Sequence, residues 1–262
     1  MKRPASSRTE ALVLAWFSEH RRPLPWRETD DPYAILVSEV MLQQTQVARV
    51  LERYQPWLER WPSVEALAVA PAADVLTAWV GLGYNRRALR LRDACAIVAR
   101  DGWPDDLTTL PGVGQYTAAA VGALAFGRRV VQIDVNVERV LLRTGWTPPQ
   151  DPDPRLGEAL MELGALLCRA RQADCALCPL SGVCPSAGTV VAAARARAGQ
   201  GERERFEDSD RWVRGRIVAA LAHGTALPRD LAPGRFERAA AGLINDGLVM
   251  QGAGGELRLA DG

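Results

Sequence analysis

The chain has 262 residues, of which 48% are hydrophobic and 24% charged, and its formal net charge is +1. This composition is typical of a globular protein with one large or two modest domains. No apolar run reaches the roughly 18 residues of a membrane span, and no secretory signal opens the chain, so we expect a cytoplasmic protein outside the membrane. Because Lys2 is the only lysine and His20 and His223 are the only histidines, a multi-histidine metal site is excluded and catalysis by a side-chain Schiff base or by histidine is not expected.

Residues 9–186 predict a run of helices separated by proline and glycine. Apolar side chains recur at helical spacing between Ile35 and Leu58. Alternating strand patterns are nearly absent, so the fold class expected for this part is all-α. Further helices are expected over residues 74–79, 86–100, 116–126, 136–143 and 158–167.

The composition changes after residue 186. Residues 187–207 are small and charged, which predicts a linker. Two helices are expected next, at 212–221 and 235–245, and then two short strands, at 248–251 and 256–259. This order resembles a small winged-helix module. The predicted organisation is a domain over 1–186, a linker over 187–207 and a module over 208–262.

Four of the five cysteines lie in one short segment with the spacing C-x6-C-x2-C-x5-C, namely Cys168, Cys175, Cys178 and Cys184. In a cytoplasmic chain, clustered cysteines are more often metal ligands than disulfides. Four thiolates suit either Zn²⁺ or an iron–sulfur cluster. A zinc ribbon usually has two C-x2-C pairs, and this segment has one. The fifth cysteine, Cys95, is expected to be a buried thiol without a role.

A glycine-rich turn lies between two predicted helices. Its sequence Leu110-Pro111-Gly112-Val113-Gly114 allows a tight turn and a close approach of the backbone to another molecule. The amides that open the following helix can hold a phosphate. The candidate contacts to a phosphate, or to a DNA backbone if the resemblance described below holds, are Gly112, Val113 and Gly114.

Several separate motifs follow one another along the chain. They are Leu24-Pro25-Trp26-Arg27, Ser38-Glu39-Val40-Met41-Leu42-Gln43-Gln44-Thr45, Gly81-Leu82-Gly83-Tyr84, Asp134-Val135-Asn136 and the segment 159–165 before Cys168. Together with the glycine-rich turn and the cysteine segment, they resemble the MutY-type adenine DNA glycosylases of the endonuclease III superfamily over about residues 10–186. The resemblance implies a two-lobed helix-hairpin-helix fold with a [4Fe–4S] cluster on the four cysteines. It also implies a monomer that acts on double-stranded DNA carrying a mismatch or an oxidised lesion, and that is nucleoid-associated if the source is bacterial.

Two carboxyl groups carry the chemistry that the resemblance implies. Cleaving an N-glycosidic bond requires a protonated leaving base and a stabilised oxocarbenium-like sugar, and two carboxyl groups in different environments can divide this work. Glu39 has apolar neighbours, so partial burial is expected to favour its protonated form; the resemblance assigns it protonation of adenine N7 and activation of water. Asp134 is expected at the start of a helix and ionised. The resemblance pairs it with the sugar cation, although an aspartate there can also be an ordinary N-cap.

Further positions follow from the resemblance alone. Tyr116 stands where the bifunctional endonuclease III branch has its Schiff-base lysine, which implies a monofunctional enzyme that leaves an abasic site. Asn136 matches a polar residue beside the catalytic aspartate, and Gln44 and Tyr84 match residues that wedge into the duplex. Positions around the extruded adenine are Trp26, Arg27 and Glu158. Four arginines are candidate phosphate contacts, namely Arg86, Arg87, Arg90 and Arg92.

Two features leave alternatives open. Familiar adenine glycosylases read 8-oxoguanine with a MutT-like C-terminal domain, and residues 187–262 are too few for a domain of roughly 100–150 residues. Recognition of 8-oxoguanine is then either absent or carried out by the tail or the catalytic domain. Tyr116 also occurs in the thymine-mismatch branch, so an enzyme that removes thymine or uracil opposite guanine is the nearest alternative. A non-catalytic iron–sulfur protein that binds DNA is the next.

Overall fold

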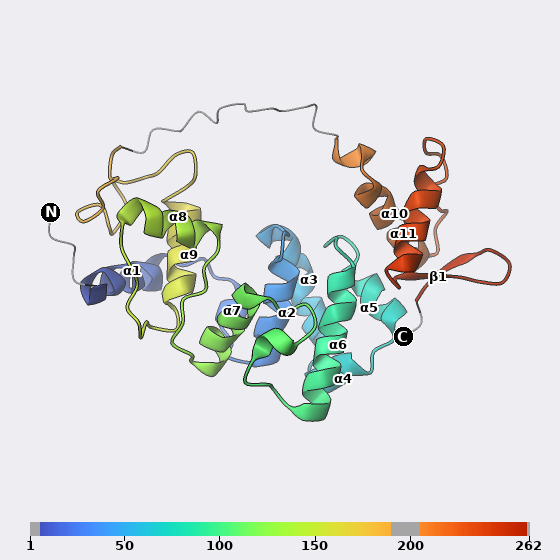
Figure 1. Ribbon diagram of the computed structural model, residues 1–262, viewed down its shortest axis with the longest axis horizontal. Helices are drawn as coiled ribbons and strands as arrows, with labels where there is room; N and C mark the ends of the chain where they lie inside the picture. The colour runs from blue at the N-terminus through green and yellow to red at the C-terminus, as the bar shows by residue number, and fades with distance from the viewer. Residues whose placement is uncertain (1–5, 190–204, 261–262) are drawn as a thin grey trace. The chain divides into compact units, whose positions relative to one another are not determined.

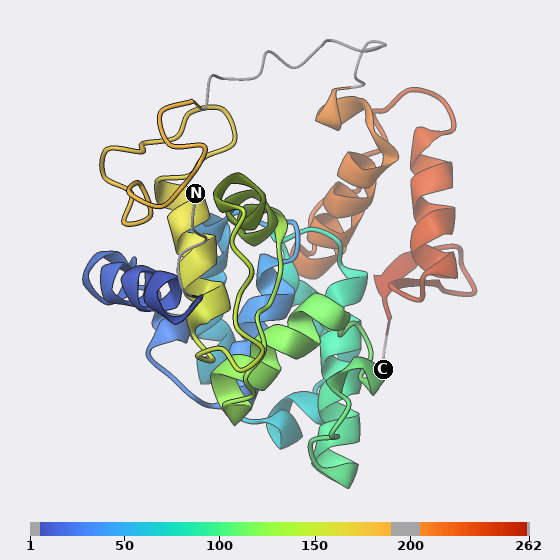
Figure 2. The same cartoon turned by 60° about the vertical axis from the view of Figure 1, so that its left-hand side comes forward.

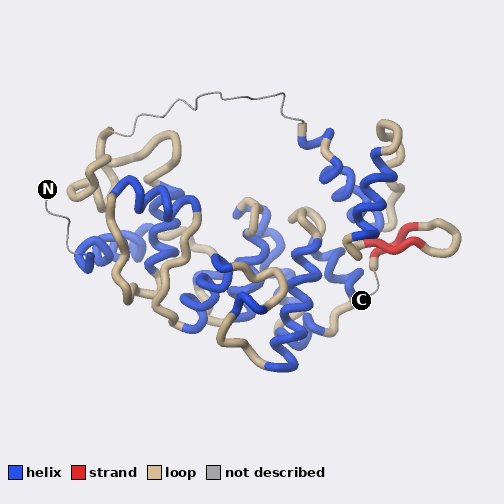
Figure 3. Tube along the Cα trace, in the orientation of Figure 1, coloured by secondary structure: helices blue, strands red, loops and turns tan. Residues whose placement is uncertain are grey.

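A computed structural model of the chain describes residues 6–189 and 205–260. These residues form eleven α-helices, three short 3₁₀ helices and one two-stranded sheet, which confirms the predicted helical fold class (Figure 3). None of the helices in the described ranges is both long and apolar enough to cross a membrane. The chain divides into two compact units, Met1–Leu36 with Val113–Ala198 and Val37–Gly112 with Gly199–Gly262. Most of the predicted linker lies outside the described residues, and the predicted domain boundaries stay a prediction.

The first unit is built around α9 (Figures 1 and 2). Both α1 and α8 pack against α9, and their buried side chains form one core that includes Trp16, Phe17, Val140 and Leu160. The cysteine segment continues directly from α9 and contributes Leu180 to the same core. The elements of this unit are α1 (Ser6–His20), η1 (Pro25–Arg27), α7 (Gln115–Phe126), α8 (Val135–Thr144) and α9 (Leu156–Leu166).

Helix α2 (Pro32–Leu42) runs from the first unit into the second. Its start is encoded locally, because the Asp31 carboxylate accepts hydrogen bonds from the amides of Tyr33 (3.0 Å) and Ala34 (3.4 Å). Pro32 stands at the first helical position, where a missing N–H costs nothing. The side chains from Tyr33 to Met41 are all buried, so this helix has no solvated face.

The second unit has a core rich in tryptophan. The Trp57 ring meets the edges of Trp61 and Trp79, with centroids 4.7 and 5.3 Å apart. Helices α4 and α5 both pack on α6, the longest helix of the unit. The elements are α3 (Val47–Arg60), α4 (Val64–Ala68), α5 (Ala72–Trp79), α6 (Arg86–Asp101) and η2 (Leu107–Thr109).

The C-terminal module belongs to the second unit. It consists of η3 (Phe206–Asp208), α10 (Asp210–His223), α11 (Arg235–Asn245) and a hairpin of β1 (Val249–Gln251) and β2 (Leu257–Leu259). The strands are antiparallel, with Val249 opposite Leu259. Helix α10 packs on α11, on β2 and on α5, so the module is anchored to the helical part of its unit (Figure 1). The order of helices and hairpin is the one predicted.

Candidate active site

Asp134 caps the amino terminus of α8. Its Oδ1 atom accepts hydrogen bonds from the backbone amides of Asn136 and Val137, both at 2.8 Å. Its Oδ2 atom accepts one from the side-chain amide of Asn136, at 2.6 Å. Asp134 is therefore an N-cap, as the simpler interpretation predicted, and the same bonds fix the orientation of its carboxylate. Because Asp134 stays half-exposed, the capping role does not prevent contact with a substrate.

Arg139 fixes the orientation of the side-chain amide of Asn136. Its guanidinium donates to the side-chain oxygen of Asn136 at 2.7 Å and to the carbonyls of Gly164 and Cys168, both at 2.8 Å. With its oxygen occupied by Arg139, Asn136 presents its NH₂ group to Asp134. Sequence reasoning missed Arg139, because an arginine on a helix otherwise looks solvated. The contact ties Asp134 to the end of α9.

Gly164 lets α8 and α9 meet at this point. A Cβ atom on Gly164 would lie 2.8 Å from the Cβ atom of Asn136 and 3.0 Å from its carbonyl oxygen. Such distances are too short for a packed interior, so any larger residue would push α8 away. Tyr116, near the start of α7, also contacts α9, because its hydroxyl lies 3.2 Å from the Met161 sulfur.

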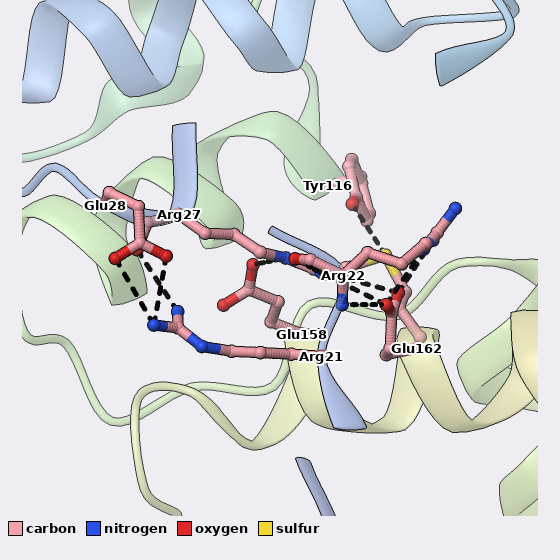
Figure 4. Close-up of polar contacts among 8 residues, drawn as sticks. Arg21, Arg22, Arg27, Glu28, Tyr116, Glu158 and Glu162 are labelled. Carbon is pink, nitrogen blue, oxygen red and sulfur yellow. Dashed lines mark hydrogen bonds and ion pairs between the residues drawn. The ribbon is translucent and has the colours of Figure 1, made fainter. Parts of the chain in front are cut away.

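Trp26, Arg27 and Glu158 line one cavity of about 290 Å³ in the first unit. The Arg27 Nε atom donates to Glu158 at 2.6 Å, and both side chains are buried (Figure 4). Glu158 is thus not a surface acid of its helix. The structure brings together the three residues that were predicted to surround the extruded base.

Glu162 supports this ion pair from one turn further along α9. It receives hydrogen bonds from Arg22 at 2.7 Å and from Arg27 at 3.0 Å, and it is 1% exposed (Figure 4). Burial alone would raise the pKa of Glu162, but the hydrogen bonds from Arg22 and Arg27 outweigh it and lower the pKa to about 2. Glu162 is therefore a carboxylate near neutral pH and holds Arg27 in place.

Glu39 lies in the second half of α2. It is 8% exposed, and its neighbours Ser38 and Val40 are 1% and 3% exposed. The burial expected from its apolar neighbours is present.

Gln44 and Tyr84, the predicted wedge residues, share an unusual backbone. Among the described residues they are the only two non-glycine residues with positive φ, at 56° and 49°. L-residues rarely adopt this conformation, and it persists only where the surroundings enforce it. Both side chains are exposed, so neither packs in the core of the unit.

Arg87 enforces both turns. Its Nη1 atom donates to the carbonyls of Val40, Met41 and Gln43, and its Nη2 atom donates to Thr45 Oγ1 and the carbonyls of Leu82 and Gly83, all within 3.1 Å. Burial lowers the pKa of Arg87 to about 10, partly offset by Tyr84. The prediction of a phosphate contact is wrong for Arg87, because its guanidinium is buried in protein hydrogen bonds.

Replacing Arg87 by lysine should therefore damage both loops. The lysine ammonium has three N–H donors and lacks the planar guanidinium that reaches both loops. Some of the backbone carbonyls that now accept from Arg87 would therefore lose their hydrogen bonds. We expect the free energy of unfolding to fall by about 3 kcal/mol in urea titrations. Base excision at saturating enzyme should also slow by roughly tenfold or more. Arg100→Lys is the matched control, since Arg100 lies on the same helix and is 72% exposed. A variant as stable and active as the control would contradict this role.

The four clustered cysteines line one small cavity of about 20 Å³ at the end of α8. None of the five cysteines forms a disulfide, and Cys95 is buried, with its pKa raised to about 12 by burial. Burial also raises the pKa of Cys178 and Cys184, and their neighbouring cysteines add to the effect. Among the described residues, no three or more His, Cys, Asp and Glu side chains are placed so that they could hold a metal ion.

Arg143, in the last turn of α8, joins that helix to the cysteine segment. It donates to the sulfur of Cys168 at 3.3 Å and to the carbonyls of Arg169 and Ala170 at 2.9 and 3.0 Å. Its own carbonyl accepts from Ser186 at 2.8 Å. Helix α8 therefore has Asp134 at its amino terminus and a contact to Cys168 in its last turn.

The glycine-rich turn leads into α7 as predicted. Gly112 has a φ of +78°, which favours glycine, and no side chain caps the amino terminus of α7 at Gly114. Gly114 and Gln115 are exposed there. An uncapped, exposed helix start is the geometry that holds an anion.

These features are those of a helix-hairpin-helix DNA glycosylase, and the similarity of the chain to known proteins agrees with this class. Residues 37–165 match the model of the HhH-GPD superfamily of base excision DNA repair proteins. An adenine DNA glycosylase from Mycobacterium tuberculosis is 40% identical over 293 aligned residues, which cover 96% of this chain and 93% of that protein. This chain belongs to the adenine DNA glycosylases.

Two solved structures resemble the fold. A thermostable thymine-DNA glycosylase has a TM-score of 0.61 and 27% identity, and the match covers 69% of this chain and 95% of that one. Endonuclease III in a non-covalent complex with DNA has a TM-score of 0.61 and 21% identity, with coverages of 72% and 98%. The endonuclease III likeness supports the fold alone.

Proposed function

We propose that this enzyme removes adenine mispaired with guanine or 8-oxoguanine from double-stranded DNA, as a monomer that works at the nucleoid. The observation that carries the proposal is the contrast between two carboxyl groups. Glu39 is shielded within α2, whereas Asp134 is half-exposed and held by three N–H donors. Such a contrast suits one acid and one carboxylate anion.

In the proposed mechanism Glu39 gives its proton to N7 of the adenine. The C1′–N9 bond then breaks with its electron pair on the base, which leaves as neutral adenine. The ionised Asp134 stabilises the positive charge on the sugar. The Glu39 carboxylate next removes a proton from water, hydroxide adds to C1′, and the products are free adenine, an abasic site and a restored acid.

The flipped base requires a pocket, and Trp26, Arg27 and Glu158 are proposed to form part of its wall, although the cavity that these three residues line includes neither Glu39 nor Asp134. An indole and fixed charged groups suit a flat, polar purine. Gln44 and Tyr84, on their strained turns, would fill the space that the base leaves. Gly112, Val113 and Gly114 would hold the DNA backbone by their amides.

No lyase step is expected. The Schiff-base route requires an amine, and Lys2 is the only lysine of the chain. Tyr116 stands where the bifunctional relatives have their lysine, so the proposed product keeps the sugar–phosphate strand intact.

The cysteine segment is proposed to hold a [4Fe–4S] cluster on Cys168, Cys175, Cys178 and Cys184. All four thiols line one cavity, and Arg143 donates to the Cys168 sulfur, as expected beside an anionic ligand set. The cluster would supply structural cross-linking of the segment that follows α9. Purified protein should be brown and contain iron, whereas colourless protein that contains zinc would overturn the assignment.

Single-turnover excision on four duplexes tests the activity. With A:8-oxoguanine and A:G pairs, wild-type enzyme should release adenine and leave an alkali-labile strand that stays intact without alkali. With T:G and U:G pairs it should release nothing. Release of thymine or uracil in place of adenine would overturn the proposal. It would favour the alternative of a thymine or uracil mismatch glycosylase, with which Tyr116 and the 27% identical thymine-DNA glycosylase are both compatible.

A further inference from the structure

A groove of about 840 Å³ runs through the second unit between the helical part and the C-terminal module. Gln44 and Tyr84 line it on one side, and residues of η3 and α10 line it on the other. The contacts of α5 with α10 and with β2 fix these two sides relative to each other. The groove thus begins at the predicted wedge residues and is completed by the module.

The groove is strongly basic. Its lining includes six exposed or half-exposed arginines and a single acidic residue, Asp246. Arg86 and Arg214 both pair with Asp246, so their charges are partly neutralised. The other arginines have no carboxylate partner among the described residues, namely Arg49, Arg90, Arg211 and Arg216. Positive charge concentrated in a cleft, on a chain with a net charge of +1, fits a polyanionic ligand.

Arg211 connects the module directly to Tyr84. Its guanidinium lies 4.8 Å from the centroid of the Tyr84 ring and hydrogen-bonds the tyrosine hydroxyl. Arg216, further along α10, lies over the ring of Trp212 at 4.8 Å. Arg211 and Arg216 are therefore each supported by an aromatic ring, which orients a guanidinium without neutralising it.

We propose that this groove binds the sugar–phosphate backbone of the DNA duplex beside the wedge residues. Four uncompensated guanidiniums on two sides suit phosphate oxygens, which arginine binds bidentately. The inference rests on the proposed function in one respect, that Tyr84 enters the duplex. DNA in contact with Tyr84 would then also lie against Arg211 and α10. The C-terminal module is accordingly a DNA-binding part of the enzyme and acts without reading the base sequence.

The test removes one arginine from each side of the groove. The double variant Arg90→Gln, Arg216→Gln is compared with Arg100→Gln, Arg238→Gln, which takes the same two charges from α6 and from the module at exposed positions outside the groove. Fluorescence anisotropy over a salt series gives the affinity for a fully paired duplex and for one with an A:G pair.

We expect the slope of log K against log salt to become shallower by about 2 in the groove variant, and affinity near 0.1 M salt to fall roughly 10- to 50-fold. Both duplexes should be affected equally. Arg216→Glu should weaken binding more than Arg216→Gln. The control pair should change the slope and the affinity much less.

Equal losses in the groove variant and in the control pair, or no loss in either, would overturn the inference. A loss confined to the A:G duplex would also overturn it, because phosphate contacts carry no base information. Since binding to the paired duplex requires no excision, a failure here is separable from a failure of the proposed function. Wild-type enzyme that binds through the groove but releases no adenine would refute only the latter.

Discussion

Glu39→Gln should release adenine roughly 10³-fold more slowly than wild type, or worse, in single-turnover assays. The amide cannot give a proton to adenine N7 and cannot later activate water, so both proton transfers are lost. The substitution keeps the shape of a side chain that is 8% exposed within a fully buried stretch of α2, so the fold and the affinity for DNA should be preserved.

Glu52→Gln is the matched control for that variant. Glu52 is an exposed acid on α3 of the second unit, and its replacement should leave excision unchanged. Circular dichroism and DNA affinity would show that both variants are folded. Undiminished excision by Glu39→Gln would remove the acid from the mechanism, and a wild-type protein without activity would favour the non-catalytic DNA-binding alternative.

Local features of the chain predicted much of the fold. Helix α11 has the predicted bounds, and α7 and α8 begin one residue earlier than expected, because each starts at a turn or a capping residue that is visible in the sequence. The apolar stripe between Ile35 and Leu58 did not show the break between α2 and α3. That break depends on the positive φ of Gln44, which distant contacts with Arg87 enforce.

The same distinction applies to the site. The cysteine spacing and the Asp134–Asn136 pair lie within short segments, so the sequence displays them. The ion pair of Arg27 with Glu158 joins residues 131 positions apart, and the contact between Arg139 and Gly164 spans 25. Composition and periodicity do not encode such distances, and a buried arginine in a helix resembles a solvated one until the helices are packed. The roles of Arg87, Arg139 and Glu162 therefore required the structure.

Asp134→Asn separates the two roles of this residue. Asparagine is as good an N-cap as aspartate, so α8 should still start at the same position. One contact is lost, because Arg139 holds the oxygen of Asn136 and the two side-chain amides would then face each other with donor groups. We expect a decrease of about 1 kcal/mol in the free energy of unfolding. The negative charge beside the sugar disappears entirely, and excision should fall by roughly 10²- to 10³-fold.

Asp106→Asn provides the comparison that makes this result interpretable. Asp106 caps η2 by accepting from the Thr108 amide at 3.0 Å, so it shares the capping role and has no proposed part in catalysis. Urea denaturation should show similar, small losses of stability for both variants, while only Asp134→Asn loses activity. If the two variants retained equal activity, Asp134 would be an N-cap and nothing more. The sugar cation would then have to be stabilised by another group.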